Sequence, residues 1–87
     1  MNGNVPVLPN PTPEMFMRKA IRLAEQAARD GEVPVGAVIV RAGRIIAQAH
    51  NQVEKLKDGT AHAEMIALTI AAAAVGDWRL NDCEMYV

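Results

Sequence analysis

The chain has 87 residues and a formal net charge of −1, which leaves room for one small domain. With 51% hydrophobic and 22% charged residues, an intrinsically disordered chain is excluded. The balanced charge lacks the basic excess of proteins that grip nucleic acid through its phosphates. We expect no membrane partner, because no apolar run reaches the roughly 20 residues that a membrane span needs. The single Cys83 forms no internal disulfide and no secretory signal is visible at the N-terminus, so the predicted compartment is the cytoplasm.

The N-terminal part predicts an arm followed by a helix. Residues 1–12 contain three prolines and predict an extended, Pro-rich arm without regular structure. Thr12 is a suitable cap and Pro13 a suitable first residue for a helix. Apolar residues recur at steps of three and four from residue 16 to 28, which predicts an amphipathic helix that stops at Gly31.

A hairpin is predicted next. Residues 33–40 end in an unbroken apolar run, which is typical of a strand covered on both faces. Ala42 and Gly43 predict a turn, and residues 44–49 predict the returning strand. The polar residues 51–59 that follow predict a loop.

The C-terminal part predicts a second helix and a last strand. Thr60 is the expected cap of a helix over residues 61–75, and Gly76 ends it. Most sides of that helix are apolar, which predicts a buried helix. Residues 83–87 predict a strand, and the order helix, hairpin, helix, strand predicts an α/β fold with helices on a small sheet. So short a chain cannot cover both the apolar helix and the edge of the last strand, so we expect a complementing partner.

His62 and Glu64 are the residues that suggest chemistry. Histidine is a common zinc ligand and glutamate a common acid/base group. Positions two apart differ by about 200° around a helix, so the pair shares one site only at the mouth of the helix. Taken alone, this spacing arises often by chance.

Four sequence blocks surround this pair and occur in a fixed order. They are E-V-P-V-G-A-V-I-V at residues 32–40, H-N at 50–51, D-G-T-A-H-A-E-M at 58–65 and G-D-W-R-L-N-D-C-E-M-Y-V at 76–87. With these blocks, residues 13–87 resemble the N-terminal half of the tRNA-specific adenosine deaminases, within the zinc-dependent cytidine deaminase superfamily. The resemblance implies a three-layer cytidine deaminase-like fold, of which residues 13–87 form the first half. One departure is Gly59, where the family usually has proline.

The resemblance implies a role for five residues. His62 would be one zinc ligand, and Glu64 would move a proton between the zinc-bound water and the base. Asn51 would hydrogen-bond the base, although the residue by itself fits a turn after a strand equally well. The backbone N–H of Ala63 would help to hold the base, and Val33 would line the apolar wall of the pocket.

The same resemblance implies missing zinc ligands. In the family, a strand ending in Tyr-Val is followed by P-C-x-x-C, whose two cysteines complete the zinc site, whereas this sequence stops at Val87. A catalytic zinc site needs about three protein ligands plus water, and this chain offers His62 alone. Cys83 fits a small buried apolar residue, and His50 fits the end of a strand. We therefore expect no zinc binding and no activity from this chain alone.

The leading hypothesis is half of a zinc-dependent hydrolytic deaminase that converts adenosine to inosine in tRNA when a second half or chain supplies the two cysteines. An alternative is deamination of a free base or nucleotide such as guanine or cytosine, which the near-neutral charge favours. Another is a truncated, non-catalytic binding module. Homodimers are common in the family, so a homo-oligomer is a further option. The local candidates for phosphate contacts are Arg41, Arg44, Lys55 and Lys57.

Overall fold

The computed structural model describes residues 11–87, so the first ten residues of the predicted arm lie outside the described residues. Residues 11 and 12 have no regular secondary structure. The elements, in chain order, are α1 (Pro13–Arg29), β1 (Gly36–Arg41), β2 (Arg44–His50), α2 (Val53–Leu56), α3 (Ala63–Val75) and β3 (Cys83–Tyr86).

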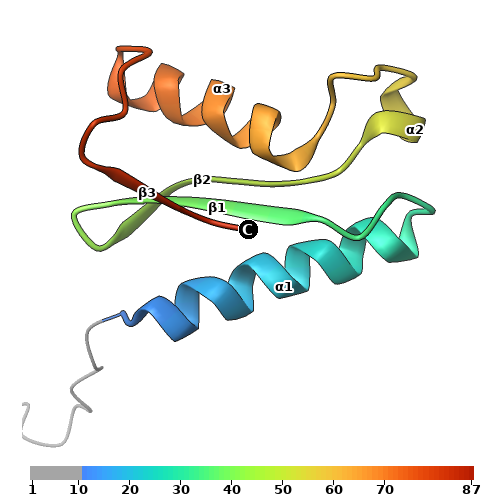
Figure 1. Cartoon of the computed structure of the whole chain (residues 1–87), viewed down its shortest axis with the longest axis horizontal. Helices are drawn as coiled ribbons and strands as arrows, with labels where there is room; N and C mark the ends of the chain where they lie inside the picture. The colour runs from blue at the N-terminus through green and yellow to red at the C-terminus, as the bar shows by residue number, and fades with distance from the viewer. Residues whose placement is uncertain (1–10) are drawn as a thin grey trace, which may run out of the picture.

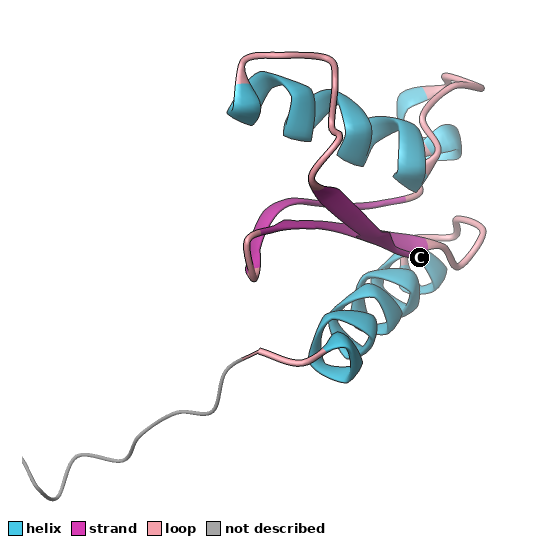
Figure 2. Ribbon diagram, turned by 60° about the vertical axis from the view of Figure 1, so that its left-hand side comes forward, coloured by secondary structure: helices cyan, strands magenta, loops and turns pink. Residues whose placement is uncertain are grey.

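These elements form three layers. The sheet has the strand order β2-β1-β3, and the central strand β1 is antiparallel to both neighbours. Helix α1 covers one face of the sheet and α3 covers the other (Figures 1 and 2). Residues 36–40 of β1 are all buried, which confirms the prediction of a strand covered on both faces. The α/β class and the predicted order of elements are also confirmed.

Helix α1 forms as its sequence predicts. The Thr12 side chain accepts a hydrogen bond from the N–H of Met15 at 3.2 Å, and Pro13 occupies the first turn. One stripe of the helix is buried against the sheet and consists of Phe16, Ala20, Leu23 and Ala27. The Phe16 ring lies 5.3 Å from that of Tyr86 in a tilted arrangement, which ties the start of the helix to β3.

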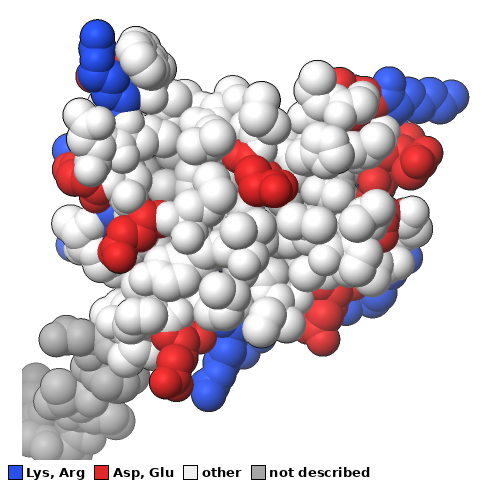
Figure 3. All heavy atoms as spheres, viewed as in Figure 1, with Lys and Arg blue, Asp and Glu red and all other residues white. Residues whose placement is uncertain are grey.

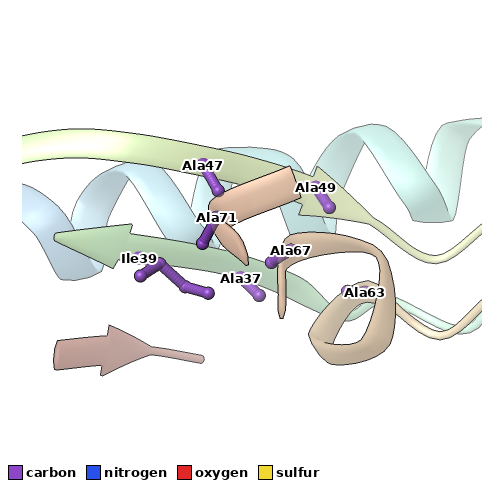
Figure 4. Close-up of a cluster of buried hydrophobic side chains, with 7 residues drawn as sticks. All are labelled: Ala37, Ile39, Ala47, Ala49, Ala63, Ala67 and Ala71. Atoms are coloured by element: carbon purple, nitrogen blue, oxygen red, sulfur yellow. The ribbon is translucent and has the colours of Figure 1, made fainter. Parts of the chain in front are cut away.

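Helix α3 packs on the sheet through alanines. Every fourth residue of α3, from Ala63 to Ala71, faces the strands and packs against small or branched side chains of the sheet (Figure 4). The buried cluster consists of Ala37, Ile39, Ala47, Ala49, Ala63, Ala67 and Ala71. The other side of α3 leaves Met65, Leu68 and Ile70 between 40% and 53% exposed. Residues 11–87 therefore bury α3 on one side only and leave its other apolar side uncovered, as expected for a chain too short to cover the whole helix.

The start of α3 also differs from the prediction. The cap is His62, with φ −76° and ψ 146°, and the helix begins at Ala63 rather than Ala61. Thr60 does not cap α3, because its hydroxyl donates to Asp58 Oδ1 at 2.7 Å. A side chain distant in sequence, that of Asn51, accepts the first helical N–H instead. Local residue preferences carry no information about such a contact.

The connecting segments hold one further correction. Ala42 and Gly43 turn the predicted hairpin with φ 51° and 75°, the left-handed pair of a tight two-residue turn. The predicted loop over residues 51–59, however, contains the one-turn helix α2, whose C-terminal cap is Lys57 with φ 52°. Its first turn is held by a carboxylate from another segment, described below. No helix within residues 11–87 is long and apolar enough to cross a membrane.

Gly36 sets how closely α1 approaches β1. A Cβ atom added there would lie 2.6 Å from both the Ala24 backbone nitrogen and the Leu23 Cβ, and against the Ala20 carbonyl oxygen. We predict that Gly36→Ala lowers the free energy of unfolding by about 3 kcal/mol, because backbone atoms cannot move aside as a flexible side chain does. Urea denaturation followed by circular dichroism measures the change. The control is Gly59→Ala, where a Cβ meets nothing within 4 Å. Equal stability of the two variants would contradict this packing.

Candidate functional site

His62 and Glu64 both lie at the mouth of α3. His62 is the cap residue, Ala63 the first helical residue and Glu64 the second. The His62 side chain is exposed and that of Glu64 is half-buried. This placement allows the two side chains to share one site, because residues two positions apart in sequence point to opposite sides of a helix except at its end.

Asn51 joins the mouth of α3 to the sheet. It is 3% exposed and follows directly after β2. Its side-chain Oδ1 accepts the N–H of Ala63 at 2.7 Å, and its backbone N–H donates to the Val35 carbonyl oxygen at 3.1 Å. One residue therefore fixes the first turn of the helix relative to the segment that leads into β1. Of the two sequence-based interpretations of Asn51, neither included this capping contact.

The structure brings Asn51 and Ala63 together directly, as partners of one hydrogen bond. His50, beside them, is half-buried at the end of β2, as expected, and its Nδ1 lies 3.3 Å from the Asn51 carbonyl oxygen. Two of the predicted site residues thus share a contact, and two more, His62 and Glu64, flank it along the chain.

Val33 lies in the turn between α1 and β1. The Val35 N–H donates to the Val33 carbonyl oxygen at 2.8 Å, which closes a three-residue turn around Pro34. The Val33 side chain is 67% exposed, so it is free to contact a ligand. The turn belongs to the segment that Asn51 contacts through Val35.

A β-turn leads into the mouth of α3. The Ala61 N–H donates to the Asp58 carbonyl oxygen at 3.0 Å, which places Gly59 at the second position of the turn. The Asp58 carboxylate accepts the Thr60 hydroxyl at 2.7 Å and the Thr60 N–H at 2.8 Å. These two hydrogen bonds, that of the hydroxyl first, hold the pKa of Asp58 below its ordinary value.

The described residues offer one candidate metal ligand at this site. Within residues 11–87, no group of three or more His, Cys, Asp or Glu side chains could hold a metal ion. Cys83 at the start of β3 packs against the core beneath α3, but it is half-buried and so less buried than its interpretation as a small buried apolar residue predicted. Because catalytic zinc takes about three protein ligands, His62 with its described neighbours does not make a complete zinc site.

Sequence reasoning missed Glu32. This residue is 7% exposed, and its two carboxylate oxygens accept the N–H groups of Glu54 and Lys55. It lies inside the first sequence block but matches no catalytic or metal-binding pattern. A charged residue between a helix stop and a buried strand was the available signal.

The comparisons with known proteins place this site in a family. A model of the cytidine and deoxycytidylate deaminase zinc-binding region matches residues 11–87. The chain belongs to this deaminase family. The tRNA-specific adenosine deaminase of Aquifex aeolicus is 53% identical over 74 residues, which are 85% of this chain and 49% of that relative. The Bacillus subtilis tRNA-specific adenosine deaminase is 47% identical over 85% of this chain and 46% of its own length. This chain therefore spans about half of these relatives.

Solved structures share the fold. One from a study of A-to-I editing by tRNA:A34 deaminases is 41% identical, with a TM-score of 0.80 over 84% of this chain and 56% of that chain. The guanine deaminase of Bacillus subtilis is 40% identical, with a TM-score of 0.83 over 87% of this chain and 49% of that chain. The cytidine deaminase-like fold and the resemblance to the tRNA deaminases are confirmed.

Removing the Asn51 side chain tests its capping role. We predict that Asn51→Ala costs about 1–3 kcal/mol of unfolding free energy, because the Ala63 N–H is then buried without a partner. Asn51→Asp, which keeps an acceptor and suits a helix N-terminus, should lose clearly less. Urea denaturation of both variants provides the comparison. Equal losses in the two would show that the hydrogen bond does not stabilise the fold.

The departure at Gly59 is testable through the turn it occupies. Proline is favoured at the second position of a β-turn, and nothing lies within 4 Å of an added Cβ at Gly59. We predict that Gly59→Pro stabilises the fold by about 0.4–1 kcal/mol, because it restricts the unfolded chain. Thermal denaturation measures the shift. Gly43→Pro is the matched control and should destabilise, since Gly43 has φ 75°. A lower melting temperature for Gly59→Pro would rule out the turn described here.

Proposed function

We propose that residues 13–87 form the N-terminal half of a zinc-dependent hydrolytic deaminase that converts adenosine to inosine in tRNA. The observation that carries the proposal is the placement of His62 and Glu64 at one helix mouth, in a chain of the deaminase family. The proposed tRNA substrate is supported by relatives with 47–53% identity, which are tRNA deaminases. In this proposal the protein works in the cytoplasm, where its tRNA substrate is found.

Each site residue has a role in the proposed reaction. His62 provides one ligand for zinc, and zinc, when bound, makes a water molecule acidic enough to supply hydroxide near neutral pH. Glu64 would take one proton from the attacking water and deliver it to the ring nitrogen of the base. It would then move the second proton of that water from the new C–OH group to the amino group, which leaves as ammonia. Asn51 reads the base through its amide NH₂ group, since its Oδ1 already accepts the Ala63 N–H.

Ala63 and Val33 shape the pocket in the same proposal. Ala63 is fully buried at the first turn, so its backbone brings the base close to the helix mouth. The exposed Val33 side chain provides an apolar wall against the plane of the base. Because the Ala63 N–H already donates to Asn51 Oδ1, it would help to hold the base by orienting the Asn51 carboxamide.

A second half or a second chain would complete the site by supplying two cysteine ligands. Support comes from the apolar side chains that flank β3 on both faces of the sheet. Leu68, Leu80 and Met85 line a groove on the α3 side. Met17, Ile21 and Val87 line another on the α1 side. A strand added beside β3, with a helix on each face, would bury both grooves.

The charge distribution suggests where tRNA would be held. On the face shown in Figure 3, Lys and Arg side chains lie toward the margins and the middle carries few charged groups. Arg41 is paired with Asp82 at 2.9 Å, which occupies one of the four candidate phosphate contacts. Arg44, Lys55 and Lys57 would then be the candidate phosphate contacts of this half. Further contacts would come from the completing half, or from a second copy if the enzyme is a homo-oligomer.

A second candidate function is deamination of a free base. The observation that favours it is the guanine deaminase structure, whose TM-score of 0.83 compares with 0.80 for the tRNA:A34 deaminase structure. The higher identity to the tRNA deaminases, at 53%, favours tRNA. The third hypothesis, a non-catalytic module, rests on the single ligand that the described residues offer.

Reconstitution tests the proposal. We would co-purify this chain with the C-terminal half of the Aquifex aeolicus relative and measure inosine in tRNA and xanthine from guanine. We predict inosine formation, lowered by about 10²–10⁴-fold in Glu64→Gln, because that variant cannot accept the proton. Glu25→Gln, an exposed glutamate on α1, is the control and should keep full activity.

The outcomes separate the three functions. Xanthine without inosine would replace the tRNA hypothesis with the free-base hypothesis. A zinc-loaded pair that forms neither product would contradict the tRNA hypothesis and, for guanine, the free-base hypothesis. A pair that assembles but binds no zinc would favour the binding module.

A further inference from the structure

Glu32 is a buried carboxylate that the proposed reaction does not use. Glu32 and Asn51 are the two buried polar residues within residues 11–87. Its Oε1 accepts the N–H of Glu54 at 3.0 Å, and its Oε2 accepts the N–H of Lys55 at 2.8 Å. Both oxygens thus bind backbone groups that lie 22 and 23 residues further along the chain. Hydrogen bonds to a carboxylate are stronger than neutral ones, so this contact holds the α2 segment firmly.

Glu32 is itself anchored to α1 and to the candidate pocket. Its backbone N–H donates to the Ala27 carbonyl oxygen at 2.9 Å, at the last turn of α1. The next residue is Val33, the predicted pocket wall. Three residues after Glu32, the Val35 carbonyl oxygen accepts the Asn51 N–H at 3.1 Å. The segments 32–35 and 51–55 are therefore joined at both ends by hydrogen bonds.

The α2 segment is in turn joined to the mouth of α3. The Gln52 N–H donates to the Ala61 carbonyl oxygen at 3.0 Å, and the Ala63 N–H donates to Asn51 Oδ1 at 2.7 Å. Both contacts come from residues directly before α2, whose first turn Glu32 holds. A shift of that turn would therefore move the groups that fix Ala63.

We propose that Glu32 is a positioning residue for the site at the mouth of α3: by holding α2 through two backbone N–H groups, it fixes where Asn51 meets Ala63. The consequence for deamination rests on the proposed function of that site, whereas the mechanical coupling does not. Glutamine cannot replace the carboxylate, because its NH₂ group would face one of the two N–H donors. The described residues offer Glu32 no ion-pair partner, so the two N–H groups are what stabilise its charge.

Amide hydrogen exchange of the full chain tests the coupling without any activity measurement. In the native protein, the amides of Gln52, Lys55 and Ala63 should open together, with one opening free energy below that of β1. In Glu32→Gln, exchange at Ala63 and Gln52 should accelerate roughly tenfold to a hundredfold, while β1 amides stay within about twofold. The Ala63 amide proton should also shift in the NMR spectrum, because its short hydrogen bond to Asn51 lengthens.

Glu54→Gln is the matched control. It removes the same charge within the segment, but the Glu54 contact to Glu32 is made by its backbone, so exchange at Ala63 should not change. Acceleration confined to Glu54 and Lys55 would overturn the proposal, since Glu32 would then act only on its direct partners. Equal acceleration across β1 would also overturn it, because that pattern indicates a general loss of stability. If Glu32→Gln does not fold, hydrogen exchange of the native protein tests the proposal instead. Different opening free energies for the Lys55 and Ala63 amides would then overturn the coupling. None of these outcomes depends on whether the chain deaminates anything.

Discussion

The hydrogen bond from the Ala63 N–H to the Asn51 side chain is the contact on which the candidate site depends. It connects the end of β2 to the first turn of α3, and the Asn51 backbone extends the connection to Val35 before β1. An unpaired buried N–H costs free energy comparable to a lost hydrogen bond. The acceptor that Asn51 provides therefore favours a helix that begins at Ala63. Its position there puts His62 in the cap and Glu64 in the first turn.

The three layers explain why this mouth is fixed in space. Strand β1 is buried on both faces, and the alanines of α3 allow the helix to lie close to it. Gly36 allows a similarly close approach of α1 on the other face. Alanines thus hold α3 to the sheet, whereas α1 packs on it through Phe16 and Leu23 as well as alanines. Larger apolar side chains of α3, such as Met65 and Ile70, remain exposed. Such a surface fits a domain that has further parts to pack against, as proposed above.

Much of this arrangement could be predicted from the sequence. The stripe from Phe16 to Ala27 identified α1, the apolar run ending at Val40 identified the central strand, and the turn at Gly43 identified the hairpin. These elements follow from periodicity and turn chemistry, which act over a few neighbouring residues. The H-x-E spacing also predicted that a shared site requires His62 and Glu64 at the mouth of a helix, and the structure has both residues there.

The remainder depends on contacts between distant residues. The start of α3 was expected at Ala61 because Thr60 is a good local cap, but Asn51 supplies the cap from twelve residues away. The one-turn helix α2 was missed because Glu32 holds it from another segment. Hydrogen bonds across such separations leave no trace in local residue preference. Glu32 was missed for the same reason, because its role depends on the N–H groups of Glu54 and Lys55, which lie next to it only in the folded chain.

The central claim is that this chain contributes His62 as its one zinc ligand to a site completed by another half. The most direct measurement is the zinc content of the reconstituted pair with His62→Ala and, as the matched histidine control, His50→Ala. The account predicts one zinc per pair, lost in His62→Ala and kept in His50→Ala. Zinc that persists in His62→Ala, or is lost in His50→Ala instead, would contradict it.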